Sequence, residues 1–130
     1  MIIDLSAIVA ILKREPGWKD FAKALDAAET NSISAPSFFE VSIVVDCWKS
    51  PVLSRELDEL FERFKIAIEP FTAEQARIAR QAYRDFGKGS GHRANLNFGD
   101  CFSYALARDK REPILFKGDD FVHTDLRAAI

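Results

Sequence analysis

Four short apolar runs alternate with longer segments of helical periodicity, and this alternation restricts the fold more than any other feature of the chain. We predict strands at 1–3, 33–35, 66–68 and 113–116. We predict helices at 6–13, 18–29, from Pro36 onward, and at 54–64, 73–86 and 101–108. Strands that alternate with helices form βαβ units and a parallel sheet. The sequence therefore predicts an α/β domain of three layers, with a central parallel sheet of about four or five strands flanked by helices.

Size and charge narrow the class of protein further. The chain has 130 residues, of which 48% are hydrophobic, and this suits one compact domain spanning 1–130. A formal net charge of -2 excludes a broadly basic nucleic-acid binder, so any contact with RNA or DNA has to be local. The sequence contains neither a secretory signal pattern nor an apolar stretch of about 20 residues, so we expect a soluble cytoplasmic protein that is not bound to a membrane.

The cysteines and several aromatic residues are predicted to lie in the core. Cys47 and Cys101 fit neither a disulfide scaffold nor zinc-ligand spacing, so we expect reduced thiols among core residues. Large aromatic side chains are more often buried than used as platforms for stacking nucleic-acid bases. The same expectation therefore applies to Trp18, Phe38, Phe39 and Phe98.

Acidic residues stand at four places where the neighbouring sequence is apolar. These are Asp4 in MIIDLSAIVAIL, Glu40 in PSFFEVSIVV, Asp100 in NFGDCFSYALA, and the pair Asp119 and Asp120 after PILFKG. A single carboxylate at such a place is usually a helix cap or a turn former. Burying several ionised carboxylates is costly unless a cation compensates them. The four places together predict a shared charged ligand, of which a divalent metal ion is the simplest.

The predicted elements bring these acids to one edge of the sheet. Asp4 follows the first strand and the Asp119–Asp120 pair follows the last, at the edge where open α/β sheets place their sites. Asp100 is a plausible N-cap of its helix, and Glu40 lies just over one turn inside its own, on a stripe with Ile43 and Val44. All four side chains can therefore reach one crevice.

Oxygen ligands without a nearby His or Cys favour Mg2+, with Mn2+ as a possible substitute. Such an ion polarises a phosphoryl oxygen and supplies hydroxide for attack on a phosphodiester. We expect Asp4 and Asp100 to bind the metal directly, Glu40 to complete the shell or position water, and Asp119 or Asp120 to hold a water or a second ion. Ser6 is predicted either to hydrogen-bond a ligand carboxylate or phosphate, or to cap the first helix.

The sequence blocks around these acids resemble PIN-domain ribonucleases, in particular the VapC toxins of bacterial toxin–antitoxin modules. The blocks are IIDLSAIVAIL followed by EP, then ISAPSFFEV, LNFGDCFSYALA and ILFKGDDFVHTDL, and they span essentially the whole chain. The resemblance implies a PIN-like fold and an Mg2+-dependent endoribonuclease with Asp4, Glu40 and Asp100 as metal-binding acids. It also implies a homodimer, a cognate VapB-type antitoxin that places a basic side chain among the acids, and a higher-order complex with it. Leu5 stands where the family usually has Thr, and the family pattern does not choose between Asp119 and Asp120.

Two other functions and one further candidate site remain open from the sequence. The acids could belong to a phosphatase or phosphoryl-accepting domain, although the second Asp of a DxD motif is absent after the first strand. They could also form a non-catalytic surface that binds a basic partner. Lys88, His92 and Arg93, in the glycine-rich loop, could contact RNA phosphates or belong to a solvated loop.

Overall fold

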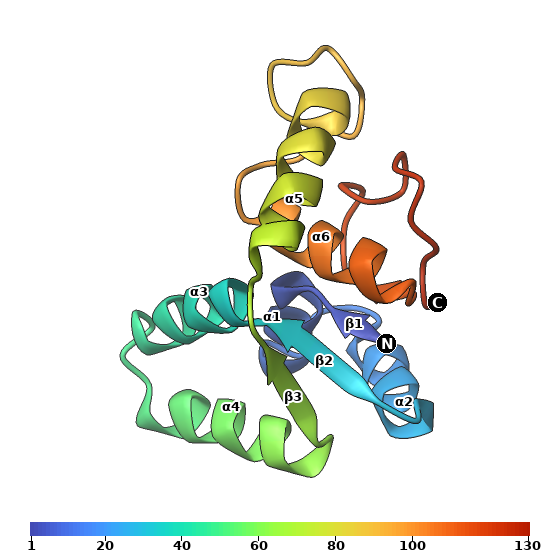
Figure 1. Ribbon diagram of the computed structural model, residues 1–130. Helices are drawn as coiled ribbons and strands as arrows, with labels where there is room; N and C mark the ends of the chain where they lie inside the picture. Colours follow the sequence, from blue (N-terminus) through green and yellow to red (C-terminus); the bar gives the residue numbers. More distant parts are fainter.

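The computed structural model describes residues 1–130 and contains a four-stranded parallel sheet in the order β3-β2-β1-β4 (Figure 1). Its elements are β1 (Ile2–Ile3), α1 (Leu5–Leu12), α2 (Trp18–Ala27), β2 (Asn31–Ser34), α3 (Ala35–Asp46), α4 (Pro51–Arg63), β3 (Ile66–Glu69), α5 (Ala73–Phe86), α6 (Asp100–Lys110) and β4 (Ile114–Leu115). The predicted α/β class and parallel sheet are confirmed. No helix is both long and apolar enough to cross a membrane.

The two short strands β1 and β4 lie between the two layers of the core. Successive strand residues point to opposite faces of a sheet. Ile3 and Leu115 accordingly pack with α1, α2, α3 and α4, whereas Ile2 and Ile114 pack with α5 and α6. All four of these side chains are fully buried. The sheet is thus covered by helices on both faces, as the three-layer prediction requires (Figure 1).

The order of the strands makes β1 the switch point of the sheet. The chain leaves β1 through α1 and α2 to pair β2 on one side, whereas β4 pairs on the other side of β1. Such a switch point, at the carboxyl ends of parallel strands, is where open α/β sheets bind their ligands. The backbone N–H of Asp4 still donates to the carbonyl of Leu115 at 2.9 Å, which fixes the residue that follows β1 against the end of β4.

The first turns of α5 and α6 are capped in different ways. Thr72 caps α5 by accepting a hydrogen bond from the backbone N–H of Gln75. The Gln75 side chain donates to Asp109 on α6 instead of accepting a hydrogen bond from the Thr72 backbone N–H, so only half of a capping box forms. Asp100 is the first residue of α6 rather than its N-cap. The backbone N–H of Asp100 is instead satisfied by the side chain of Asn97 at 2.9 Å.

Some residues predicted for the core are exposed. Phe39 and Phe98 are 66% and 76% exposed, and Cys47 also lies at the surface, so these predictions are wrong. Phe39 is on the outer face of α3, and Phe98 lies in the turn before α6. Helical spacing and aromatic character gave no information about which face of α3 meets the sheet. Cys101, by contrast, is buried as predicted.

Candidate metal centre

Asp4 is the most firmly held of the acids. It caps α1 and is only 4% exposed. One carboxylate oxygen, Oδ2, accepts hydrogen bonds from the backbone N–H of Ser6 at 3.0 Å and from the Ser6 hydroxyl at 2.6 Å. The other, Oδ1, accepts from the hydroxyl of Ser103 at 2.7 Å. Ser6 therefore hydrogen-bonds a carboxylate, which is one of its two predicted roles. Its other predicted role, capping the first helix, belongs to Asp4.

Asp100 is the second buried acid, at 9% exposure. Its Oδ2 accepts a hydrogen bond from the backbone N–H of Asn97 at 2.8 Å. Burial raises the pKa of Asp100 to about 7, against the opposing effect of that hydrogen bond, and the charges of Asp4, Asp120 and Glu40 raise it further. Asp4, Asp120 and Glu40 are therefore near enough to Asp100 for their charges to disfavour its ionised form.

Glu40 reaches this environment from α3. Its carboxylate lies against Gly99, where an added Cβ would come within 2.7 Å of Oε2. Partial burial and the charge of Asp4 raise the pKa of Glu40. The side chain itself is exposed, and its neighbour Ile43 is 47% exposed, so the predicted burial on an apolar stripe is wrong.

The turn after β4 carries the remaining two acids, both exposed. Partial burial, together with the charges of Asp4 and Asp119, raises the pKa of Asp120. The charge of Asp120 also raises the pKa of Asp100, whereas Asp119 is not among the groups that affect it. The turn is tied to α1 because the backbone N–H of Lys117 donates to the Ser6 hydroxyl at 3.0 Å. Because its charge acts on Asp100, Asp120 is better placed than Asp119 to belong to the group of acids.

No positive side chain compensates the acids. The seven ion pairs of the structure include none of Asp4, Glu40, Asp100, Asp119 and Asp120. No group of three or more His, Cys, Asp or Glu side chains is already spaced to hold a metal ion. Mg2+ is commonly bound by only one or two carboxylates and several waters. Two buried acids, with exposed acids beside them and no countercharge, fit that mode of binding.

Lys88, His92 and Arg93 of the glycine-rich loop make no ion pair with the acids. His92 packs edge-on against Phe86 with ring centroids 5.0 Å apart, and its Nδ1 accepts from the backbone N–H of Ala94. Lys88 and Arg93 are exposed and form no ion pair. The structure therefore assigns His92 a packing role within the loop, and it leaves the two cations available to solvent.

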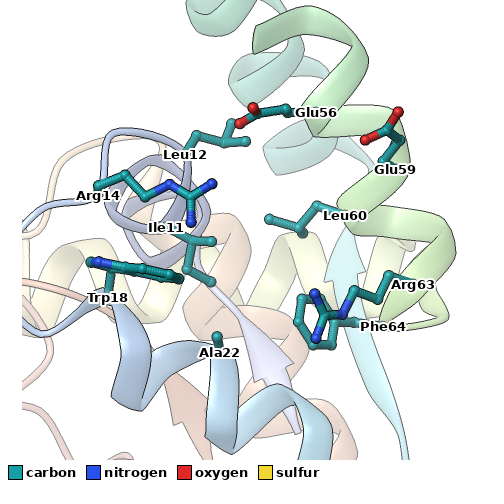
Figure 2. Close-up of a pocket in the computed structure, with 10 residues that line it drawn as sticks. All are labelled: Ile11, Leu12, Arg14, Trp18, Ala22, Glu56, Glu59, Leu60, Arg63 and Phe64. Carbon is teal, nitrogen blue, oxygen red and sulfur yellow. The ribbon is translucent and has the colours of Figure 1, made fainter. Parts of the chain in front are cut away.

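A separate apolar groove lies between α1, α2 and α4 (Figure 2). It has a volume of about 240 Å³, and its floor includes Ile11 and Leu60. The Arg14 guanidinium lies 4.5 Å from the ring centroid of Trp18 at one side of the groove. None of the candidate acids lines this groove.

Comparison with known proteins identifies the family. Residues 1–126 match the family described as PIN domain. The chain belongs to the PIN-domain family. Ribonuclease VapC28 of Mycobacterium tuberculosis is 55% identical over 130 residues, which cover 100% of this chain and 98% of that protein. The predicted resemblance is confirmed.

Solved structures share the same PIN fold. VapC20 of Mycobacterium tuberculosis, described as a sarcin-ricin loop cleaving toxin, superposes with a TM-score of 0.72 at 14% identity, covering 96% of this chain and 95% of that one. A toxin–antitoxin complex from Klebsiella pneumoniae contains a chain with a TM-score of 0.71 at 15% identity, covering 95% of this chain and 92% of that one. At these identities the likeness establishes the fold alone.

Sequence reasoning missed three polar residues that surround the PIN-domain acids. Asn97 exchanges two hydrogen bonds with Asp100. Ser37 and Ser103 are fully buried, and their hydroxyl oxygens lie 3.4 Å apart. Ser37 precedes Glu40 by three residues and Ser103 follows Asp100 by three, a spacing that places each on its acid's side of the helix. This spacing is the feature of the sequence that could have identified both serines.

Proposed function

We propose that this PIN-domain protein is an Mg2+-dependent endoribonuclease that acts as the toxin of a toxin–antitoxin pair. The observation that carries the proposal is the group of uncompensated acids at the switch point of the sheet, in a chain that is 55% identical over its full length to a named VapC ribonuclease. Carboxylates without basic partners are suited to hold a divalent ion at which a phosphodiester can bind.

Each acid receives a distinct role in this proposal. Asp4 and Asp100, the two buried acids, bind the metal ion directly. Glu40, which is exposed, completes the shell or positions the attacking water. Asp120 is the fourth acid, because its charge acts on Asp100. When bound, the metal ion polarises a phosphoryl oxygen and lowers the pKa of a bound water.

The two alternative functions are less compatible with the structure. A phosphoryl-accepting domain needs a lysine beside its nucleophilic aspartate. Lys117 is the nearest lysine to the acids along the chain, but its Nζ is bound to Glu15 at 2.9 Å and to the carbonyl of Pro16 at 3.2 Å. A surface that only recognises a basic partner would not require Asp4 and Asp100 to be buried.

Purified protein is expected to cleave single-stranded or loop RNA with Mg2+ or Mn2+ and to stop on addition of EDTA. The all-oxygen donor set favours these ions over Zn2+. The measurement is the cleavage rate of a labelled RNA as each ion is restored after chelation. Undiminished cleavage in excess EDTA would contradict the metal-dependent mechanism, and restoration by Zn2+ alone would contradict the proposed ligand chemistry.

The proposed partner is a VapB-type antitoxin that covers the acidic crevice. An arginine is the side chain best suited to enter it, because its planar fork pairs carboxylates through two hydrogen bonds. The buried charges of Asp4 and Asp100 lack such a partner within the chain itself. The likeness to a chain of the Klebsiella pneumoniae toxin–antitoxin complex is consistent with this partner.

We further propose a homodimer of the toxin. Phe39, Ile43 and Phe98 are large apolar side chains that are between 47% and 76% exposed. Exposed apolar residues of this size are typical of protein–protein interfaces. Sedimentation velocity is expected to give twice the 14.7 kDa mass of one chain, and Phe98→Ser to shift the distribution toward the single-chain mass. A single-chain mass for the parent protein at micromolar concentration would contradict the homodimer.

A further inference from the structure

A buried chain of serine hydroxyls ends on the Asp4 carboxylate. Ser103 donates to Asp4 Oδ1 at 2.7 Å, and the Ser37 hydroxyl oxygen lies 3.4 Å from that of Ser103. Both serines are fully buried, and Asp4 is 4% exposed. This series of hydroxyls connects α3, which carries Glu40, to α6, which carries Asp100. It also connects both helices to Asp4, the residue that follows β1.

The direction of these hydrogen bonds follows from proton counting. A hydroxyl has one proton to donate, and an ionised carboxylate only accepts. Because Ser103 uses its proton on Asp4, Ser37 has to be the donor in the longer contact between the two serines. The series of hydrogen bonds therefore runs from Ser37 to Ser103 to Asp4, and each hydroxyl is oriented by the next acceptor.

The other oxygen of Asp4 receives a matching set of donors. The Lys117 backbone N–H donates to Ser6, whose hydroxyl and backbone N–H both donate to Oδ2. A carboxylate has about four lone-pair sites. Two hydrogen bonds to Oδ2 and one to Oδ1 leave one free site, and it is on Oδ1. Ser103 shares that oxygen and so determines how it is oriented.

We propose that Ser103 is a positioning residue for the metal centre, oriented in turn by Ser37. This role rests on the proposed function, because the two serines affect the metal ion only through Asp4. Water cannot replace the missing hydroxyl readily, because the serines are sealed from solvent. Loss of Ser103 leaves Asp4 Oδ1 without its donor, so that only the two hydrogen bonds from Ser6 to Oδ2 hold the carboxylate.

Ser103→Ala is expected to weaken Mn2+ binding about 10- to 100-fold, the range found when a partner of a metal ligand is removed. The measurement is isothermal titration of Mn2+ into RNA-free protein, with the thermal midpoint in EDTA recorded for every variant. Ser42→Ala is the matched control, since Ser42 donates to the carbonyl of Phe38 within α3 at 2.8 Å. Its affinity for Mn2+ is expected to equal that of the parent.

A second variant tests the donor-to-acceptor direction of these hydrogen bonds. Ser37→Ala is expected to weaken Mn2+ binding less than Ser103→Ala does, and to add no further loss when combined with it, because Ser37 acts through Ser103. Should Ser103→Ala not fold, a weakened affinity of Ser37→Ala alone carries the test. A lower thermal midpoint with parental Mn2+ affinity for both variants would overturn the proposal and leave the serines a purely structural role. Absence of Mn2+ binding by the parent protein would instead overturn the metal centre itself.

Discussion

Asp100→Asn is expected to reduce RNA cleavage at least about 100-fold and to abolish growth arrest, while making the metal-free protein more stable at pH 8. The loss of activity follows from removing one of two buried charges that hold the metal ion. The gain in stability follows from removing a carboxylate that burial and neighbouring acids disfavour. An amide oxygen can still accept the hydrogen bond from the Asn97 backbone N–H, so the turn before α6 is preserved.

The sign of the stability effect depends on pH. Because the pKa of Asp100 is raised from 3.8 to about 7, the folded state binds more protons than the unfolded state between these values. The free energy of unfolding of the metal-free parent therefore falls as pH rises through that window. Asp100→Asn lacks this contribution and is expected to be more stable by about 1 to 3 kcal/mol at pH 8, with a smaller difference at pH 4.

Thermal melts in EDTA at both pH values check this prediction. Parent and variant are expected to differ by several degrees at pH 8. A variant that melts below the parent at pH 8 would mean that Asp100 is held by favourable interactions and is an ordinary residue of the helix start. Growth arrest by a well-folded Asp100→Asn variant would contradict its catalytic assignment separately.

Asp4→Asn is expected to lose cleavage to a similar extent but to lose stability as well. Asp4 accepts three hydrogen bonds, from Ser6 and Ser103, and it caps α1. An amide has one acceptor oxygen and would present an NH2 donor to one of these donors. The expected cost is about 1 to 3 kcal/mol in the free energy of unfolding.

The contrast between the two variants is the informative measurement. In EDTA at pH 8, Asp100→Asn is expected to melt above the parent and Asp4→Asn below it. Asp58→Asn serves as the control, because Asp58 is exposed on α4, away from the acids, and its side chain makes no ion pair within the chain. Equal shifts of the same sign for Asp4→Asn and Asp100→Asn would contradict the different roles assigned to these acids.

The architecture could be predicted because short apolar runs and helical periodicity are local properties. The helix predicted at 73–86 is α5 with the same bounds, since Thr72 caps it and Gly87 ends it. The strand predicted at 33–35 instead spans Asn31–Ser34. Asn31 begins this strand, and its side-chain amide donates to the carbonyls of Leu25 and Phe64, two contacts that only the tertiary fold creates.

The location of the acids could be predicted, but their supporting contacts could not. Parallel strands place their carboxyl ends at one edge, so the sequence predicts Asp4 and the Asp119–Asp120 pair there without knowledge of any side-chain contact. The hydrogen bond from Ser103 to Asp4 joins residues 99 positions apart. No local pattern specifies such a pair. The exposure of Phe39 depends likewise on how α3 packs, which periodicity alone does not determine.

The central claim is that the acids form one divalent-metal site, and the stabilisation of the protein by Mg2+ tests it most directly. A ligand that binds only the native state stabilises it by RT ln(1 + [L]/Kd), about 2.7 kcal/mol at 100 times Kd. Mg2+ is expected to raise the thermal midpoint of the parent and of Asp58→Asn, whose acid is exposed on α4, by the same amount. It is expected to raise that of Asp100→Asn by much less. Equal responses of all three proteins to Mg2+ would contradict a shared site.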